Sequence, residues 1–306
     1  MNKIGVGLYG WNGHQINEEL GDLETAYLAG ICDADDKRAQ FKTLRDLLVS
    51  SEIELVSMCS PNRGEQAGDI ILALEAGKHV IAEKPCALNE RDLDAILELS
   101  VKKGLIFCEM DHSYFAQPYY KAMELVELGA IGDVAQVLCQ KSYPYTDLRP
   151  QDESMDGGLI LQSALYGFRW IQNIAGQEIK NIHTFATSFG NPKNGGLRMA
   201  ASIQMELQNG GLAGIAANYF NNNGTGVWGY EELRIFGTKG ILRTDIKEKC
   251  VYIYSDNGVN TYMDLDPVES QLSRVISAIC TGGPLYMEPY KMTMPTRNAI
   301  RAVNNA

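Results

Sequence analysis

The first third of the chain alternates short apolar runs with amphipathic stretches. Apolar positions recur with helical spacing between runs that have the length of buried strands. The expected strands cover residues 3–9, 25–32, 55–60, 78–82 and 105–109, and the expected helices cover 13–20, 35–49, 63–76 and 89–102, the last capped by Asn89. Alternation of this kind predicts a parallel, doubly wound sheet.

The pattern changes after residue 117. A helix over 118–128 ends at Gly129, and Asn209-Gly210 is a hairpin signal between two later runs. The expected strands cover residues 134–142, 179–189, 198–208, 211–219, 232–236 and 251–254, and the expected helices lie near 159–174, 268–281 and 296–306. Strands with few intervening helices predict an α/β domain with an open, mainly antiparallel sheet. We expect domains over 1–117 and 118–306, with the final helix able to pack back on the first.

Composition sets the class of protein. The chain has 306 residues, 45% hydrophobic and 21% charged, which suits two globular domains. Its net charge of −11, without a basic cluster, argues against nucleic acid or an anionic membrane surface as a partner. No apolar run is long enough to span a bilayer, and no signal peptide is recognisable. The seven scattered cysteines show no metal-ligand spacing, so we expect reduced thiols, a cytoplasmic protein and no metal site.

A charged tripeptide ends the fourth apolar run. Glu83, Lys84 and Pro85 follow directly after residues 78–82. Open α/β sheets hold their ligands at the carboxyl ends of their strands, which is where this amine is expected. The proline keeps Lys84 out of the helical region and stiffens the turn. These residues alone do not distinguish a functional lysine from a solvated one in a loop.

A glycine-rich turn follows the first strand. The literal match to G-x-G-x-x-G begins at Gly5, but Gly5 and Gly7 lie inside the strand. We place the turn over residues 8–13, where Leu8 replaces the first glycine. Gly10 would allow a pyrophosphate to approach the backbone, and Gly13 would let a helix pack close to the sheet, with phosphates at its positive end. The expected cofactor contacts in this turn are Tyr9, Gly10, Trp11, Asn12 and Gly13. The alternative is that both glycines serve only a tight turn.

Asp33 adds weight to a nucleotide site. It follows the second strand, roughly 20 residues after the glycine turn, where an acidic side chain binds the adenosine ribose. A carboxylate there favours NAD over NADP, although Lys37 and Arg38 keep NADP as an alternative. A capping role for a following helix is the competing interpretation. The polar turn after the third strand is expected beneath the nicotinamide ribose and comprises Ser60, Pro61 and Asn62.

These motifs, in this order, resemble the glucose–fructose oxidoreductase / inositol dehydrogenase / rhizopine catabolism (Gfo/Idh/MocA) family. The resemblance also includes residues 76–80 and 128–134 and covers nearly the whole chain. It implies a Rossmann domain that holds NAD(P), with Glu83 and Lys84 at the cofactor and Lys84 also at the substrate. It further implies an open-sheet domain through which the chain forms a homodimer or homotetramer.

The second motif of that family departs from its usual form here. Where the family has Asp-x-x-x-His, this chain has Gln162 and Tyr166. A subgroup similar to glucose–fructose oxidoreductase and dihydrodiol dehydrogenase also uses tyrosine at this place, which implies that Tyr166 is the acid/base. An unperturbed tyrosine pKa of about 10 makes a poor base, so a nearby cation is needed, and Lys84 or Arg169 is expected to supply it. Gln162 and His112 are expected to contact substrate, while a core aromatic is the alternative for Tyr166.

The sequence thus predicts a cytoplasmic NAD(P)-dependent oxidoreductase. Hydride would pass between the nicotinamide and a hydroxyl or carbonyl of a small carbohydrate or polyol, with Lys84 as electrostatic clamp and Tyr166 as acid/base. A catalytically degenerate regulator that senses nucleotide or sugar is the main alternative, because Leu8 and Gln162 depart from the family pattern. A reductase of a non-sugar carbonyl, imine or tetrapyrrole is the third.

Overall fold

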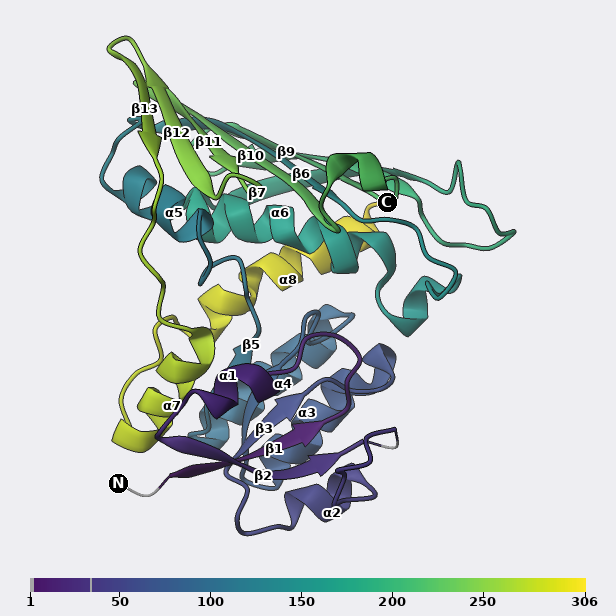
Figure 1. Cartoon of the computed structure of the whole chain (residues 1–306). Helices are drawn as coiled ribbons and strands as arrows, with labels where there is room; N and C mark the ends of the chain where they lie inside the picture. Colours follow the sequence, from purple (N-terminus) through teal and green to yellow (C-terminus); the bar gives the residue numbers. More distant parts are fainter. Residues whose placement is uncertain (1–2, 34) are drawn as a thin grey trace. The chain divides into compact units, whose positions relative to one another are not determined.

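A computed structural model of the chain describes residues 3–33 and 35–306, and it divides into two compact units (Figure 1). The first unit comprises Met1–Asp111 and Glu269–Arg297, and the second comprises His112–Val268 and Asn298–Ala306. The second unit is therefore inserted, along the chain, between two parts of the first. The sequence pattern predicts one break, between residues 117 and 118, with the final helix able to pack back on the first domain.

Parallel strands form the sheet of the first unit, in the order β2-β1-β3-β4-β5 (Figure 1). Their bounds are β1 Ile4–Tyr9, β2 Ala26–Cys32, β3 Leu55–Met58, β4 His79–Ala82 and β5 Phe107–Glu109. The order reverses between β1 and β3, and open α/β sheets bind ligands outside the carboxyl ends of strands at such a switch point. The predicted parallel, doubly wound sheet is confirmed.

Helices complete the core of this unit. They are α1 Asn17–Gly21, α2 Leu44–Leu48, the 3-10 turn η1 Arg63–Glu65, α3 Gln66–Glu75, α4 Glu90–Lys103, α7 Gln271–Thr281 and the first part of α8 Pro289–Asn304. Asn89 caps α4 as predicted, its side chain accepting from the Asp92 amide at 2.9 Å. Leu20 of α1 and Val275 of α7 belong to one buried cluster with Val6 and Leu8 of β1, so α1 and α7 close the same face of the sheet.

Two helices of the first unit are shorter than predicted. The helix expected over 13–20 begins only at Asn17, because side-chain hydrogen bonds hold Gln15 in a loop. The Gln15 Nε2 donates to the Gly10 carbonyl at 2.9 Å, and its Oε1 accepts from the Ser57 hydroxyl at 2.6 Å. The helix expected over 35–49 covers only Leu44–Leu48. The Asp36 side chain accepts from the Arg38 amide, and such local bonds compete with helix formation.

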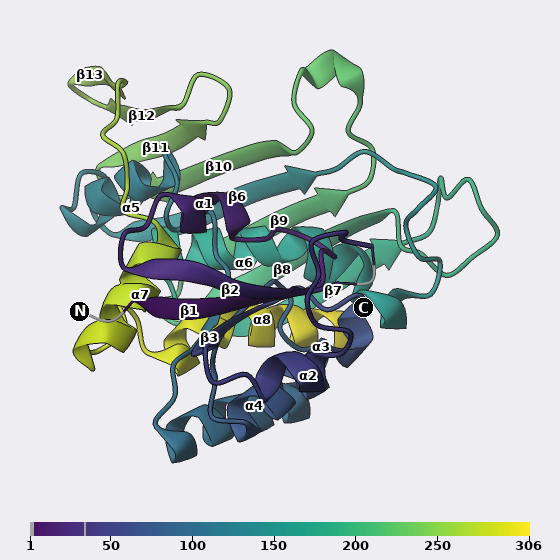
Figure 2. The same ribbon diagram turned by 60° about the horizontal axis from the view of Figure 1, so that its bottom comes forward.

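The sheet of the second unit has the order β13-β12-β11-β10-β6-β9-β8-β7 (Figure 2). Its strands are β6 Val134–Ser142, β7 Ile179–Thr187, β8 Ala200–Leu207, β9 Leu212–Asn218, β10 Tyr230–Gly237, β11 Gly240–Asp245, β12 Cys250–Ser255 and β13 Gly258–Tyr262. Neighbours are antiparallel except β6 and β9, so the predicted open, mainly antiparallel sheet is confirmed. The sequence pattern misses β11 and β13. For β13 the reason is that the strand is mostly exposed and lacks an apolar face.

Helices cover one face of this second sheet. They are α5 Tyr119–Glu127 and a continuous helical run made of a π-helical segment η3 Ile160–Ala164, α6 Leu165–Arg169 and a second π-helical segment η4 Trp170–Ile174. Gly167 allows close packing, because a Cβ there would lie 2.7 Å from Ile215 of β9. Short 3-10 turns lie at η2 Glu153–Met155 and η5 Asn223–Thr225.

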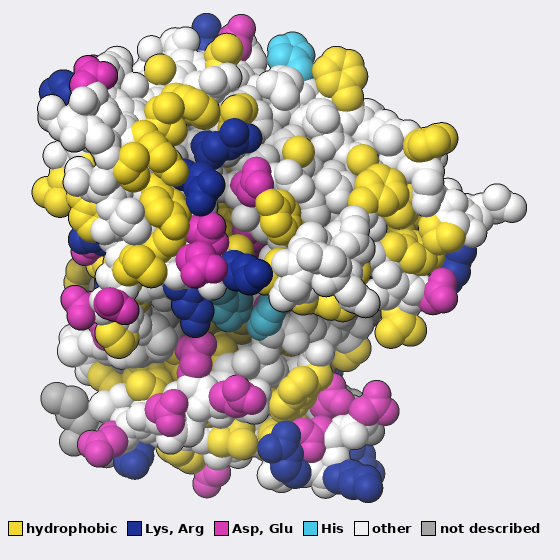
Figure 3. All heavy atoms as spheres, turned by 45° about the horizontal axis from the view of Figure 1, so that its top comes forward, with side chains coloured by type: hydrophobic (Ala, Val, Ile, Leu, Met, Phe, Trp, Pro, Cys, Tyr) yellow, Lys and Arg dark blue, Asp and Glu magenta, His cyan; other side chains and the backbone are white. Residues whose placement is uncertain are grey.

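The last helix starts earlier than predicted. It begins at Pro289 rather than residue 296 and contains Pro295, whereas a proline in a helix interior normally marks a boundary. None of the helices formed by the described residues is both long and apolar enough to cross a membrane. Figure 3 shows acidic and basic side chains intermingled over one face of the molecule, without a block of one sign.

Candidate functional site

The turn after β1 lies at the switch point of the first sheet. Gly10 has φ +69°, and a Cβ there would lie 2.2 Å from the carbonyl oxygen of Cys59, so only glycine fits. Gly13 has φ +129°, and a Cβ there would lie 2.7 Å from Glu83 Cγ. Gly13 therefore packs against Glu83. The expected helix start at Gly13 is wrong, because α1 begins at Asn17.

Backbone amides of this turn have mostly internal partners. The amides of Gly10 and Asn12 donate to the carbonyls of Cys32 and Cys59 at 3.0 and 3.3 Å, and the Gly13 amide donates to Trp11. Among the described residues the Trp11 amide has no hydrogen-bond partner. A dinucleotide phosphate would therefore contact the Trp11 amide and the Gly10 backbone, which carries no side chain of its own, rather than the N-terminus of a helix.

Asp33 follows β2 and is half-buried. Its Oδ1 accepts from the Asp35 amide at 2.8 Å, and within the described ranges its Oδ2 has no protein donor. The competing role of helix cap is excluded, because the next helix begins at Leu44 and its cap is Thr43, in a reciprocal pair with Asp46. The free oxygen is the group that a ribose hydroxyl would use, so this edge of the sheet fits a dinucleotide.

The polar turn after β3 is held by protein contacts. The buried Ser60 hydroxyl donates to Asp69 at 2.8 Å, and the Asn62 side chain accepts from Gly64 at the start of η1. The Pro61 carbonyl accepts from the Asn12 side chain at 3.1 Å, which joins this turn to the glycine turn. Burial, together with the charge of Asp69, raises the pKa of Tyr9 to about 12 and keeps its phenol neutral.

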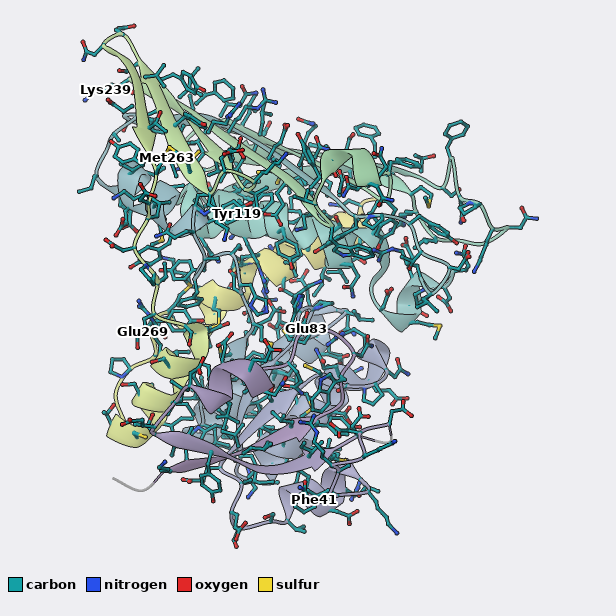
Figure 4. All side chains as sticks on the ribbon, viewed as in Figure 1. Phe41, Glu83, Tyr119, Lys239, Met263 and Glu269 are labelled. Atoms are coloured by element: carbon teal, nitrogen blue, oxygen red, sulfur yellow. The ribbon has the colours of Figure 1, made fainter. Side chains whose placement is uncertain are left out.

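Glu83 and Lys84 are both buried directly after β4 (Glu83 is labelled in Figure 4). The Glu83 carboxylate accepts from the His14 amide at 3.2 Å, and the His14 ring lies 3.4 Å away. Burial opposes ionisation, but the His14 hydrogen bond and the charges of Lys84, His14 and Arg63 outweigh it and lower the Glu83 pKa to about 2. The Lys84–Pro85 peptide bond is cis.

Arg63 and Gln66 are functional-site neighbours that the sequence pattern does not reveal. Arg63 is buried and donates to the Asn12 carbonyl and to the Gln66 side chain. The Gln66 amide donates in turn to the carbonyls of Glu83 and Pro85, at 2.6 and 3.0 Å. These two side chains therefore fix the glycine turn and the Lys84 segment relative to each other within the first unit. Arg63 and Gln66 do not form a recognisable sequence motif.

Tyr166 lies on α6 in the second unit and is buried. The ring of Tyr143 meets it edge-on at a centroid distance of 6.5 Å, and the two side chains share a hydrogen bond. The Nζ of Lys141 lies 4.3 Å from the centroid of the Tyr166 ring and 4.7 Å from that of Tyr143. Tyr166 thus lies in a polar cluster, and the alternative of a purely apolar core aromatic does not describe it.

Lys141, itself buried, has a partly buried counter-ion. It lies on β6 directly opposite Glu231 of β10, and the two side chains form an ion pair. The Tyr119 hydroxyl, at the start of α5, donates to the other carboxylate oxygen (Tyr119 is labelled in Figure 4). Burial, and then the charge of Glu231, raises the pKa of Tyr119 well above its ordinary value. The alternation of β6 places Lys141 on the same inward face as Val137 and Cys139. Its pairing with Glu231 can be recognised only once the register between the strands is known.

The remaining predicted residues lie in the second unit. His112 is exposed, at the first position of that unit. Gln162 lies in the first π-helical segment, where its amide donates to the Asp156 carbonyl at 2.5 Å. That segment departs from the α-helical spacing that would place Gln162 and Tyr166 on one face. The structure therefore brings the predicted cofactor residues together in the first unit, and it leaves the substrate roles of His112 and Gln162 as predictions.

Comparison with protein families decides the identity of the fold. Residues 4–112 match the oxidoreductase family with an NAD-binding Rossmann fold, and residues 119–243 match the GFO/IDH/MocA C-terminal domain. The chain belongs to the Gfo/Idh/MocA family of oxidoreductases. The predicted membership is confirmed. The glycine turn and Asp33 thus lie in the nicotinamide-dinucleotide domain of a Gfo/Idh/MocA protein.

Named relatives of this Gfo/Idh/MocA protein include dehydrogenases. It is 25% identical over 274 residues to a myo-inositol 2-dehydrogenase of Thermotoga maritima, covering 84% of this chain and 79% of the relative. It is 25% identical over 229 residues to a D-glucoside 3-dehydrogenase of Escherichia coli, covering 66% and 64%. The aldose-aldose oxidoreductase of Caulobacter crescentus, solved with glycerol, has the same fold with a TM-score of 0.83, 19% identity and coverage of 99% and 98%.

Proposed function

We propose that this oxidoreductase moves a hydride between NAD and a secondary hydroxyl or carbonyl of a small carbohydrate or polyol. The observation that carries the proposal is the arrangement at the edge of the first sheet. There a glycine-only turn, an acidic residue after β2 and a buried Lys84 after β4 share one ligand-binding edge. The names of the inositol and glucoside dehydrogenases among its relatives support the substrate class.

The chain's own residues would divide the work. Bound nicotinamide supplies the hydride acceptor. Asp33 binds the adenosine ribose, and the Gly10–Trp11 backbone binds a phosphate. When a secondary alcohol is oxidised, its carbon loses hydride and its hydroxyl loses a proton, which Tyr166 accepts. Lys84 stabilises the oxygen as it gains negative charge. In the reverse direction Tyr166 donates that proton to a carbonyl.

Nucleotide binding is the first test. We expect NAD(H) to bind the wild type, and Asp33→Ala to weaken it by about tenfold to a hundredfold, the value of hydrogen bonds to a charged group. Asp35→Ala is the matched control, because Asp35 is exposed and contributes only its backbone amide to the turn. Tight binding of NADP(H) alone would overturn the choice of NAD. Calorimetry in which neither nucleotide binds would instead favour a regulator that has lost the cofactor.

A turnover screen with inositols, polyols and glycosides tests the chemistry. Tyr166→Phe is expected to lower turnover by about 100-fold or more while nucleotide affinity stays within about twofold. Tyr27→Phe, at an exposed site on β2, controls for loss of a phenol. Unchanged turnover in Tyr166→Phe would remove this residue from the mechanism. Turnover of carbonyl, imine or tetrapyrrole substrates alone would favour the third sequence interpretation.

Assembly and compartment belong to the same proposal. Large apolar side chains remain exposed on four strands of the second sheet, namely Phe185, Leu212, Ile241 and Val259. We propose that the chain forms a homodimer or homotetramer through this sheet. Phe185→Asp should disrupt that assembly, and light scattering would detect the smaller particle. The cysteines are thiols rather than disulfides, which supports a reducing, cytoplasmic location.

A further inference from the structure

Lys141 is a charged residue at a position where the strand pattern calls for an apolar one. It is buried on the helix-covered face of β6, together with Val137 and Cys139. Burying an ammonium is costly unless it is paired, and Glu231 provides that pair from the adjacent strand. The ion pair is therefore fixed in place from two strands and, through Tyr119, from α5.

The position of this ammonium relative to Tyr166 gives it a chemical consequence. Its Nζ lies 4.3 Å from the ring centroid of Tyr166, in a site from which water is largely excluded. A cation at that distance stabilises a phenolate more than a phenol. The sequence alone assigns this task to Lys84 or Arg169, whereas the structure places the ammonium of Lys141 over the Tyr166 ring.

We propose that Lys141, held by Glu231, is a positioning residue that sets the protonation of Tyr166. The inference rests on the proposed function, in which Tyr166 exchanges a proton with substrate. Glu231 acts as a brake in this arrangement, because its negative charge offsets part of the field that Lys141 exerts on the phenol. The two members of the pair therefore push the acidity of Tyr166 in opposite directions.

Other titratable and charged groups surround Tyr166 in the described part of the second unit. They comprise Tyr143 after β6, Glu231 on β10, Tyr119 on α5 and, on its own helix, Arg169. Tyr143 remains a neutral hydrogen-bond partner, since burial and the charge of Tyr166 raise its pKa. Single substitutions at Lys141 and at Glu231 remove one charge of the ion pair each, so the effect of each charge on Tyr166 can be measured separately.

The experiment compares two single variants of opposite expected sign. Lys141→Met removes the cation and should raise the midpoint of the Tyr166 titration by about one pH unit or more. Glu231→Gln removes the opposing negative charge and should lower that midpoint. The readout is the NMR resonance of the Tyr166 ring carbon that bears the hydroxyl, assigned by its loss in Tyr166→Phe. The acidic limb of the pH–rate profile for alcohol oxidation should move in the same directions.

Controls separate the possible failures. Lys121→Met removes another lysine that lies over a tyrosine ring and should leave the titration unchanged. If Lys141→Met does not fold, the double variant Lys141→Met/Glu231→Leu replaces it, and its titration should also move upward. Equal Tyr166 titration in all variants would overturn the inference and leave the pair a purely structural one. Because the NMR titration needs no substrate, it also reads out if the proposed dehydrogenase activity fails.

Discussion

Two carboxylates in this chain, the buried Glu83 and the partly buried Glu231, are stabilised in different ways. Glu83 lies in a loop at the end of a strand, where a backbone amide, His14 and the adjacent Lys84 favour its anion and lower its pKa to about 2. Glu231 lies within a strand of the second sheet, where the ammonium of Lys141 and the hydroxyl of Tyr119 bind it. The first anion has several partners, Lys84 among them. The second relies mainly on the ammonium of Lys141, with the Tyr119 hydroxyl as a further donor.

This difference predicts how each site responds to substitution. Several groups stabilise the Glu83 carboxylate, so removing any one of them leaves the others in place. At Glu231 the loss of a single side chain leaves an opposite charge buried without a counter-ion. The most severe effects should therefore come from the second unit, although the predicted cofactor residues are concentrated in the first.

Lys141→Met should have the largest effect on stability. It leaves the partly buried Glu231 carboxylate without its counter-ion, which costs about 4 kcal/mol in the free energy of unfolding. The double variant Lys141→Met/Glu231→Leu should recover most of that loss, since an apolar pair of similar size is often neutral. Urea denaturation measures both. A single variant as stable as the wild type would mean that the Glu231 site tolerates charge as well as the Glu83 site does.

Glu83→Gln should have the next largest effect, and one that depends on pH. The carboxyl pKa is lowered from 4.5 to about 2, so its contribution to stability is complete above about pH 4.5 and is lost as the pH falls toward 2. The variant should be about 3 kcal/mol less stable at neutral pH, and the gap should close in acid. Glu52→Gln, at an exposed carboxylate, is the control for urea melts at several pH values. A gap independent of pH would show that shape, not charge, matters at Glu83.

Tyr119→Phe should have the smallest effect of the three. It removes the hydroxyl that donates to Glu231 but leaves the ion pair with Lys141, so the expected loss is about 1–2 kcal/mol. The stacked contact between the rings of Tyr119 and Trp170, at a centroid distance of 5.1 Å, is kept by phenylalanine. A thermal or urea melt that matched the loss in Lys141→Met would mean that the hydroxyl, rather than the ammonium, stabilises Glu231.

The same contrast explains what the sequence could predict. Both sheets, and the cluster of Gly10, Asp33 and Lys84 at one edge, follow from local patterns, because parallel strands bring their carboxyl ends together whatever the loop details. Glu83 and Lys84 are neighbours in the chain, so their electrostatic coupling follows from the sequence itself. The confirmed family membership rests on the same local motifs.

Other features depend on non-local pairing. The partnership of Lys141 and Glu231 requires the register between β6 and β10, two strands far apart in sequence. The false helix start at Gly13 has the same origin, because Ser57, distant in the chain, donates to the Gln15 side chain and helps to hold that residue in a loop. Local propensity cannot anticipate either contact.

The return of residues 269–297 to the first unit has a consequence for how the chain is made. Leu272, Val275 and Met292 belong to the same buried cluster as β1, yet they emerge from the ribosome only after residues 112–268 of the second unit. At about 5–20 residues per second, the nascent first unit would wait many seconds with one face of its sheet covered only in part, by α1. A fragment that ends near residue 117 would retain that partly covered face permanently, so expression of the cofactor unit alone calls for a fusion that supplies residues 269–297.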